Sequence, residues 1–303
     1  MKKLMILLTA LLLLVSCTAC AQTPVMKVSS PAGAPGLALA TLAVTNPENY
    51  TFVAAETISA EFAGQHADFI VAPINAGAKL FKMGKSTYQL AAVVSWGNLF
   101  IASQRENFTL EDLNGAVVTL FGESTINASV TNYAMTANGY TPAAVEYLAS
   151  AANTQSLLLS DAEAIVVTAE PALTAAKMKN DKITAYSVNE LYKAATGYDG
   201  YTQAGLFVKA ETAANQPEAV EAFLLQVQEA CDKNTTDIAA VAEAAVTLEL
   251  LPNQMVATNA IPGCAIRFMR AQEAREQVEI TANVDLTQFG GAVPADEFYY
   301  GAQ

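Results

Sequence analysis

Apolar runs of strand length alternate with helix-like patterns along most of the chain. Phe69–Ala72 is a continuous apolar run that predicts a buried strand, and Ala76–Met83 after it predicts a helix. The middle third repeats this order, because the apolar run Ala116–Phe121 is followed by a helical pattern that ends at Asn138–Gly139. Strands that alternate with helices predict βαβ units and a mostly parallel sheet, so the chain is expected to be an α/β protein.

Weaker patterns predict further elements. Val25–Val28 and Ala164–Thr168 have the length and composition of strands. Thr141–Pro142 is typical of a helix start, and the spacing of Val145, Leu148 and Ala152 predicts that a helix follows it. Glu170–Pro171 indicates the start of another helix.

Two extended apolar segments, Leu99–Gln104 and Tyr201–Lys209, lie on either side of the middle third. The simplest arrangement is a middle lobe of residues 105–206 inserted into a lobe built from residues 25–104 and 207–303. In the second part of that lobe, a helix is expected from Pro217, with an apolar stripe at positions i, i+3, i+4, i+7 and i+11: Val220, Phe223, Leu224, Val227 and Cys231.

The first residues indicate export. Lys2 and Lys3 precede the apolar run Leu4–Val15, which is too short to span a bilayer because about 20 residues are needed. We interpret residues 1–16 as a signal peptide and residues 17–24 as a tether. Ser16–Cys17 resembles the lipobox of bacterial lipoproteins, which implies a lipid on Cys17 and an extracytoplasmic protein anchored to the membrane. Cys20 fits that motif less well, and a plain secretory signal is the alternative.

Charge and composition exclude some functions. The formal net charge is −13, and loss of Lys2 and Lys3 with the signal peptide would make it −15. Such an acidic protein is poorly suited to nucleic acid, where Lys and Arg must displace counterions. Hydrophobic residues make up 52% of the chain, which allows a sizeable core, but no later segment has 18 uninterrupted apolar residues.

Few residues could hold a metal or perform nucleophilic catalysis. His66 is the only histidine, so neither a histidine metal cluster nor a Ser-His-Asp triad is available, and we interpret it as a surface turn residue. Cys231 and Cys264 are the only cysteines outside the first 20 residues. They form either one disulfide or two buried free thiols. No cofactor and no metal are predicted.

Three stretches resemble a known family, and their order along the chain strengthens the resemblance. They are Ala67–Leu80, Val94–Leu99 and Gly290–Tyr299, with support from Leu110–Val117 and Thr168–Pro171. Together they resemble solute-binding proteins of ATP-binding-cassette (ABC) transporters, in the nitrate, sulfonate and taurine class that includes the branch related to thiamine-pyrimidine binders. The resemblance implies a two-lobed periplasmic-binding-protein-like fold with a hinge. It also implies a cleft ligand and delivery to ABC permease subunits, but it does not identify the solute.

In open α/β sheets, ligands bind at the loops that follow the carboxyl ends of the strands. Four such loops are visible, two in each predicted lobe: Ser30–Gly36, Pro73–Asn75, Gly122–Thr125 and Thr168–Pro171. Helix N-termini at these loops favour an anionic group. The candidate ligand-binding residues are Asn75, Ser95, Trp96, Ser124, Thr125, Glu170 and Gln203.

Several candidates have a purely structural alternative. Ser124 and Thr125 either donate to the solute or only cap a helix, and Glu170 either favours a cationic solute or only begins a helix. Trp96 either stacks on a flat solute or anchors the core. Gln203, in the second crossover, either contacts the solute or packs in the hinge. If Trp96 and Glu170 both face the cleft, the solute is expected to be planar or zwitterionic.

The expected function is that of a monomeric, membrane-anchored solute-binding lipoprotein of an ABC importer. A surface sensor that does not take part in transport is one alternative. An enzyme on the same fold is a further alternative, although it would need an acid or base that the lone His66 does not supply.

Overall fold

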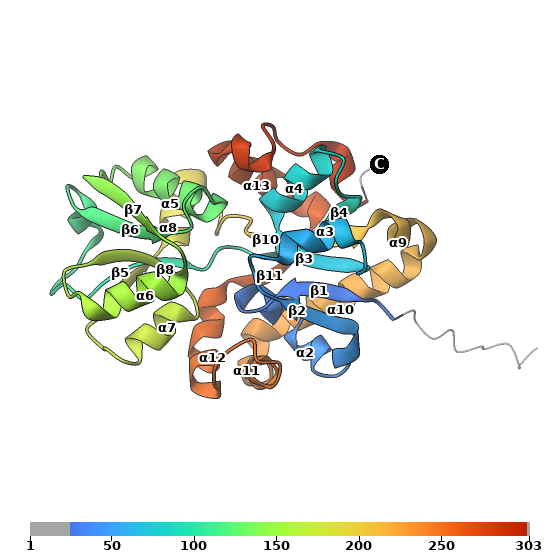
Figure 1. The fold of residues 1–303 in the computed structure, drawn as a ribbon, viewed down its shortest axis with the longest axis horizontal. Helices are drawn as coiled ribbons and strands as arrows, with labels where there is room; N and C mark the ends of the chain where they lie inside the picture. The colour runs from blue at the N-terminus through green and yellow to red at the C-terminus, as the bar shows by residue number, and fades with distance from the viewer. Residues whose placement is uncertain (1–24, 302–303) are drawn as a thin grey trace, which may run out of the picture.

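In the computed structural model, which describes residues 25–301, the strands form two separate sheets (Figure 1). The first sheet has the order β11-β4-β10-β3-β1-β2. Its strands are β1 (Val28–Pro31), β2 (Tyr50–Val53), β3 (Phe69–Pro73), β4 (Tyr88–Ser95), β10 (Ala204–Lys209) and β11 (Ile266–Arg270). The second sheet has the order β7-β6-β8-β5-β9. Its strands are β5 (Leu99–Ser103), β6 (Val117–Phe121), β7 (Ala144–Leu148), β8 (Ile165–Ala169) and β9 (Thr184–Ser187).

The predicted fold class is confirmed, since four strands of each sheet point in the same direction. In the first sheet β1 pairs in parallel with β2 and β3, and β4 has the same direction because both β3 and β4 pair antiparallel with β10. In the second sheet β6 pairs in parallel with β7 and β8, and β5 pairs antiparallel with β8 and β9. The reversed strands are β5, β10 and β11, since β11 pairs antiparallel with β4. Of these, β5 and β10 are the first strands after the two crossovers between the lobes.

Helices cover both sheets. The helices of the first lobe are α2 (Ala40–Ala43), α3 (Glu61–Gly64), α4 (Ile74–Lys82), α9 (Ala210–Asn215), α10 (Pro217–Thr236), α11 (Ile238–Thr247), α12 (Gln254–Ala260) and α13 (Ala271–Val284). Those of the second lobe are α5 (Ile126–Ala137), α6 (Ala151–Ser160), α7 (Ala172–Lys177) and α8 (Val188–Thr196). Three short 3-10 helices matter below: η1 (Ala34–Ala38), η5 (Ile261–Cys264) and η6 (Leu286–Phe289).

The helix expected from Pro217 is α10, and every residue of its predicted apolar stripe is buried. It packs with η1 and α11 against one face of the first sheet, in a core cluster that includes Phe69, Leu206 and Leu250. A second cluster covers the other face and continues through Trp96 and Tyr201 into the second lobe. The two lobes therefore share a continuous apolar core at the crossovers.

Two predictions about elements are wrong. Residues 144–148 form strand β7, not a helix, because they pair in parallel with β6 from Val118↔Val145 to Phe121↔Leu148. The spacing of Val145, Leu148 and Ala152 was ambiguous, since Ala152 belongs to the next helix and is exposed. The first strand begins at Val28, where it was expected to end.

The predicted lobe boundaries also change. Leu99–Ser103 pairs with β8 and β9, so this segment belongs to the second lobe, not to residues 25–104 of the first. Ala204–Leu206 pairs with β3 and β4, so it belongs to the first lobe and not to 105–206. An apolar strand gives no local signal of its hydrogen-bonding partner. The predicted signal peptide, Cys17 and the tether at residues 17–24 lie outside the described residues.

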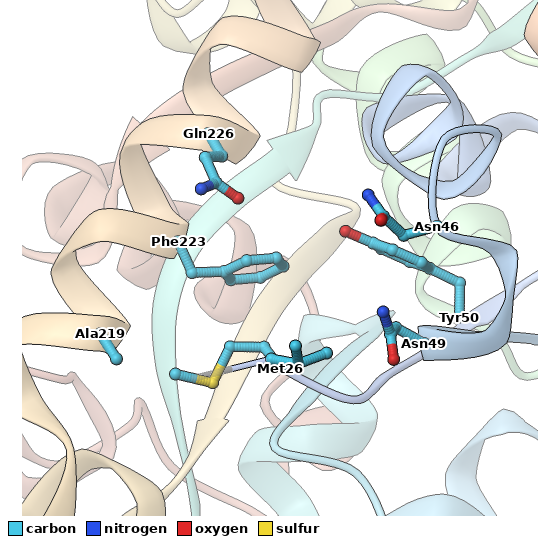
Figure 2. Close-up of a pocket in the computed structure, with 8 residues that line it drawn as sticks. Met26, Asn46, Asn49, Tyr50, Ala219, Phe223 and Gln226 are labelled. Carbon is cyan, nitrogen blue, oxygen red and sulfur yellow. The ribbon is translucent and has the colours of Figure 1, made fainter. Parts of the chain in front are cut away.

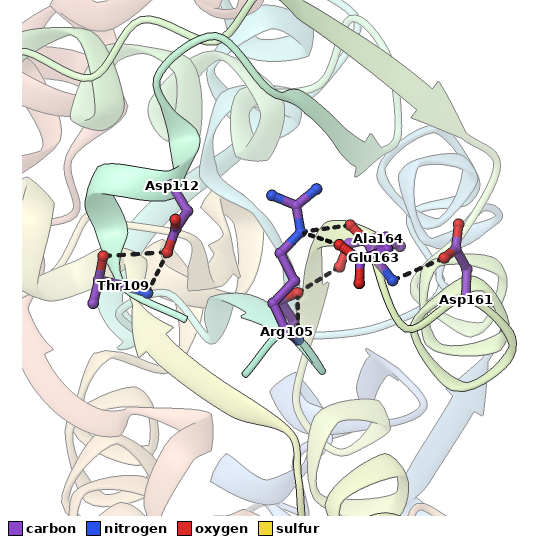
Figure 3. A network of polar contacts seen from close by, with 7 residues as sticks. Arg105, Thr109, Asp112, Asp161, Glu163 and Ala164 are labelled. Atoms are coloured by element: carbon purple, nitrogen blue, oxygen red, sulfur yellow. Dashed lines mark hydrogen bonds and ion pairs between the residues drawn. The ribbon is translucent and has the colours of Figure 1, made fainter. Parts of the chain in front are cut away.

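A polar network holds the segment that follows β5 against the start of β8 (Figure 3). The Arg105 guanidinium donates to the carbonyl of Glu163 at 2.8 Å and pairs with the Glu163 carboxylate at 3.5 Å. Farther along, Thr109 and Asp112 form a capping box that begins a short 3-10 helix. These bonds are partly exposed and serve to position the chain.

His66 lies exposed on the surface, as predicted. Within residues 25–301, no helix has the length and apolar character needed to cross a membrane. Cys231 and Cys264 are both buried free thiols, which decides between the two alternatives for these cysteines. Burial raises the pKa of both thiols.

The two thiols should therefore resist modification until the protein unfolds. In a variant with alanine at Cys17 and Cys20, a maleimide is expected to modify neither thiol of the native protein and both thiols of the denatured protein without reductant. Mass spectrometry counts the adducts. If the denatured, unreduced protein took up no maleimide, the cysteines would be joined in a disulfide.

Candidate functional site

Two short crossovers connect the lobes and lie against each other. Trp96–Asn98 joins β4 to β5, and Gly197–Gln203 joins α8 to β10. Gly97 has φ +87° and Gly200 has φ +101°. A side chain at Gly97 would collide with the Tyr201 ring, and one at Gly200 would collide with the Trp96 carbonyl. Glycine is therefore required at both positions, by the backbone conformation and by the close approach of the crossovers.

Gln203 links side chains of both lobes at this point. Its Oε1 accepts a hydrogen bond from Ser95 Oγ at 2.9 Å, and its Nε2 donates to Asn98 Oδ1 at 3.1 Å. The same Nε2 lies 3.4 Å from Asn127 Oδ1, which also accepts from the Tyr201 hydroxyl at 2.8 Å. Such a network orients each amide, because a buried polar group without a partner costs free energy.

A cavity of about 320 Å³ opens between the lobes beside Gln203. The first lobe contributes the loops after β1, β2 and β3, and the second lobe contributes the loop after β6 and the first turn of α5. This matches the rule that ligands bind outside the carboxyl ends of strands. The lining residues are Pro31, Ala32, Pro35, Ala55, Ile58, Pro73, Asn75, Ala76, Ser124, Thr125, Ile126, Asn127, Gln203, Ala204 and Gln288. We call this cavity the cleft.

The lining of the cleft combines small apolar side chains with amides and hydroxyls, and no ionisable side chain of residues 25–301 belongs to it. Asn75 Oδ1 is buried and has no hydrogen-bond partner among the described residues. Its Nδ2 lies 3.4 Å from Gln288 Oε1, and Gln288 Nε2 donates across the cleft to the Ser124 carbonyl at 2.8 Å. An acceptor without a partner in such a wall is suited to a hydrogen bond from a bound solute.

The starts of two helices reach the cleft. Helix α4 begins after Pro73 and has no side-chain cap, so its first N–H groups next to Asn75 lack a side-chain acceptor. Helix α5 is capped by Thr125, whose Oγ1 accepts from the Ala128 N–H at 3.3 Å. Thr125 therefore both caps the helix and lines the cleft.

The structure brings four of the predicted site residues into the lining of the cleft: Asn75, Ser124, Thr125 and Gln203. Ser95 lies directly behind it, buried beneath the Gln203 amide. Two further residues, Asn127 and Gln288, were not predicted. Asn127 could have been found, because it follows the predicted loop Gly122–Thr125 by two residues. Gln288 lies in η6, far along the chain, and no sequence signal pointed to it.

Trp96 is a core residue. Its side chain is only 1% exposed, and its indole N–H donates to the Arg267 carbonyl at 2.8 Å. The Arg267 guanidinium lies 4.2 Å from the centre of the indole ring, in cation–π geometry. Trp96 does not belong to the lining of the cleft, so the structure favours the alternative in which it anchors the core.

Glu170 also lies outside the lining of the cleft. It is 8% exposed and faces a second interlobe cavity of about 550 Å³, together with Phe100, Met178 and Met255. Its carboxylate accepts from the Thr174 N–H at 3.1 Å and from the Thr174 hydroxyl at 2.9 Å. Burial raises the pKa of Glu170, and the bonds from Thr174 oppose that shift. Glu170 thus does not supply a charge to the cleft.

A small cavity of about 160 Å³ lies beside Met26, Tyr50 and Phe223 (Figure 2), on the first lobe and away from the crossovers. Within residues 25–301, no group of three or more His, Cys, Asp or Glu side chains is arranged to hold a metal ion.

The arrangement of two lobes, two crossovers and a cleft lined from both lobes defines a periplasmic-binding-protein fold. A family model described as NMT1/THI5 like matches residues 36–237, more than half of the chain. The chain therefore belongs to the NMT1/THI5-like family. No curated protein matches the chain by sequence.

Solved structures agree on the fold. An ABC transporter protein of Parabacteroides distasonis is 20% identical, with a TM-score of 0.79 over 92% of this chain and 99% of that one. The periplasmic aliphatic sulphonate binding protein of Escherichia coli is 13% identical, with a TM-score of 0.70 over 92% and 93% of the two chains. A Candida albicans protein described as having the generic periplasmic binding protein fold is 10% identical, with a TM-score of 0.55 over 91% and 93%. These likenesses show the fold, so the two-lobed periplasmic-binding-protein-like fold that the resemblance implied is confirmed.

The burial of Trp96 predicts a large effect on stability. Trp96→Ala should lower the free energy of unfolding by about 3–5 kcal/mol, as is usual for a large buried aromatic side chain. Trp96→Phe, which keeps most of the packing but loses the bond to Arg267, should cost less. Denaturant unfolding measures both values, and an unchanged midpoint for Trp96→Ala would contradict this assignment to the core.

Proposed function

We propose that this protein is the solute-binding component of an ABC importer. It captures a small organic solute in the cleft and delivers it to permease subunits in the membrane. The observation that carries the proposal is the cleft itself, which has Asn75 on one lobe, Ser124 to Asn127 on the other and Gln203 at the crossover. Membership of the NMT1/THI5-like family and the fold of the ABC transporter neighbours support it.

The lining of the cleft describes the solute in part. A volume of about 320 Å³ suits a small molecule and not a long peptide. Amides offer both donors and acceptors, and the start of α4 offers N–H donors. The solute should therefore carry hydrogen-bonding groups of both kinds on a compact apolar body. A planar or zwitterionic solute is no longer specifically expected, because Trp96 and Glu170 lie outside the cleft.

Asn75 allows solute binding to be tested separately from stability. Asn75→Ala removes a buried acceptor that has no partner among residues 25–301 and loses only the long 3.4 Å contact with Gln288, so the thermal midpoint should change little. A solute that donates to this atom should bind about tenfold more weakly, since a hydrogen bond is worth about 1.5 kcal/mol.

The solute for this test is identified by native mass spectrometry of freshly purified protein. The protein is then unfolded and refolded to remove the bound solute, and the affinity is measured by calorimetry. Asn283→Ala is the matched control, because Asn283 is exposed on α13 and bonds only to the Glu279 carbonyl. Equal affinities for Asn75→Ala and the parent protein would contradict this placement of the solute.

We further propose that the mature protein is an extracytoplasmic monomer, attached to the membrane by a lipid on Cys17 and tethered by residues 17–24. The lipobox-like Ser16–Cys17 and the preceding apolar run support this part of the proposal. A lipid anchor would keep the binding protein near its permease in the membrane.

Cys17→Ala tests the anchor. In a lipoprotein-processing bacterium, this variant should lose labelling by a radioactive or clickable fatty acid and should move from the membrane fraction to the soluble or unprocessed fraction. Cys20→Ala is the control and should behave as the parent protein does. Continued labelling of Cys17→Ala would refute the anchor at this residue.

A further inference from the structure

The lobes meet a second time, on the side of the crossovers opposite to the cleft. In Figure 1, α12 of the first lobe lies beside α7 of the second, whereas α13 and α4 lie towards α5 on the other side of the crossovers. The cavity of about 550 Å³ lies at this second contact. Its lining comes from both lobes: Phe100, Glu170, Leu173, Thr174, Lys177, Met178 and Ala185 from one, and Met255, Asn259 and Gly263 from the other. We call it the back groove.

Asn98 connects the cleft to the back groove through the first crossover. Its Oδ1 accepts from Gln203 Nε2, which lines the cleft. Its Nδ2 donates to the Glu170 carbonyl at 3.0 Å, and the Glu170 N–H donates to the Asn98 carbonyl at 3.0 Å. Glu170 lines the back groove, so one crossover residue is bonded to a wall on each side.

This arrangement is that of a lever. When the lobes rotate about the crossovers so that the cleft narrows, the walls of the back groove move apart. When the cleft opens, those walls move together. Contacts across the back groove therefore favour open lobes, and any group that holds its walls apart favours closed lobes.

Gly263 is a point of close approach between the two walls of the back groove. A Cβ atom at this position would lie 2.9 Å from Glu170 Cγ, 3.1 Å from Glu170 Oε1 and 3.3 Å from Phe100 Cζ. Gly263 belongs to the first lobe, and both neighbours belong to the second. No left-handed conformation requires glycine here, since Gly263 is not among the residues with positive φ. The absence of a side chain at Gly263 is therefore what lets the walls approach.

We propose that the contact of Gly263 with Glu170 and Phe100 sets the balance between open and closed lobes, and thereby the affinity of the cleft for its solute. This inference rests on the proposed function. If the closed form is a minor population of the ligand-free protein, the apparent affinity rises in proportion to that population. A residue that never touches the solute then determines how tightly the solute is held.

Gly263→Ala tests the proposal by adding one methyl group to the back groove. Closure is measured without any solute, as the distance between spin labels on cysteines placed at Lys79 of α4 and Thr136 of α5, both exposed. The background carries alanine at Cys17 and Cys20, and Cys231 and Cys264 are buried. The labels should lie closer together in Gly263→Ala, and the co-purifying solute should bind about tenfold more tightly through slower dissociation.

A double-mutant cycle provides the control. Glu170→Ala removes the atoms closest to the added methyl, so Gly263→Ala should have little further effect on distance or affinity in that background. Should Gly263→Ala fail to fold, Met255→Ala replaces it. This variant shortens a side chain of the back groove that is 63% exposed, and it should shift the label distance in the same direction.

An unchanged or longer label distance in the ligand-free variants, or an affinity that stays equal or falls, would overturn the proposal. A parent protein that binds no co-purifying solute would contradict the proposed function instead. The label distances would still test the lever in that case, because they do not depend on a solute.

Discussion

The close packing of the two crossovers is the constraint on which the other features depend. Gly97 and Gly200 allow the two segments to touch. Both the oxygen and the nitrogen of the Gln203 side-chain amide form hydrogen bonds with side chains of both lobes. Trp96 and Tyr201 bury their rings beside this network, so the apolar core runs through the junction.

The position of the cleft follows from this junction. In each sheet the strands that point in the same direction end towards the other lobe, and their loops carry Asn75 and the segment Ser124–Asn127. Small apolar residues such as Pro31, Ala32 and Ala55 leave space between these loops. The polar groups are amides and hydroxyls, which orient a solute by hydrogen bonds, and apolar contact supplies much of the affinity.

The side opposite to the cleft has a different chemistry. Glu170 is a buried carboxyl whose raised pKa reflects lost hydration, partly compensated by two hydrogen bonds from Thr174. Met178 and Met255 remain exposed beside it, and Gly263 provides the close approach. Asn98 bonds to Gln203 of the cleft and to Glu170 of the back groove. Under the proposal above, a change in the back groove therefore alters the cleft by altering the relative position of the lobes.

The sequence by itself determined most of the local structure and part of the cleft. Strand-length apolar runs and the loops after them located β3, β6, α4 and α5, and hence Asn75, Ser124 and Thr125, because the carboxyl ends of parallel strands share one edge. Only the tertiary structure decided which sheet an element joins when the local sequence of that element does not indicate its partner. The apolar sequence of Leu99–Ser103 would suit either sheet, and pairing with β8 places it in the second. Residues 144–148 form a strand because they pair with β6. Trp96 and Glu170 both follow strand ends, as the cleft residues do, but Trp96 is buried and bonds to Arg267 of β11, and Glu170 is buried and bonds to Thr174 of α7. Burial and strand pairing depend on residues that are distant in sequence, so the local periodicity of an element does not reveal its partners.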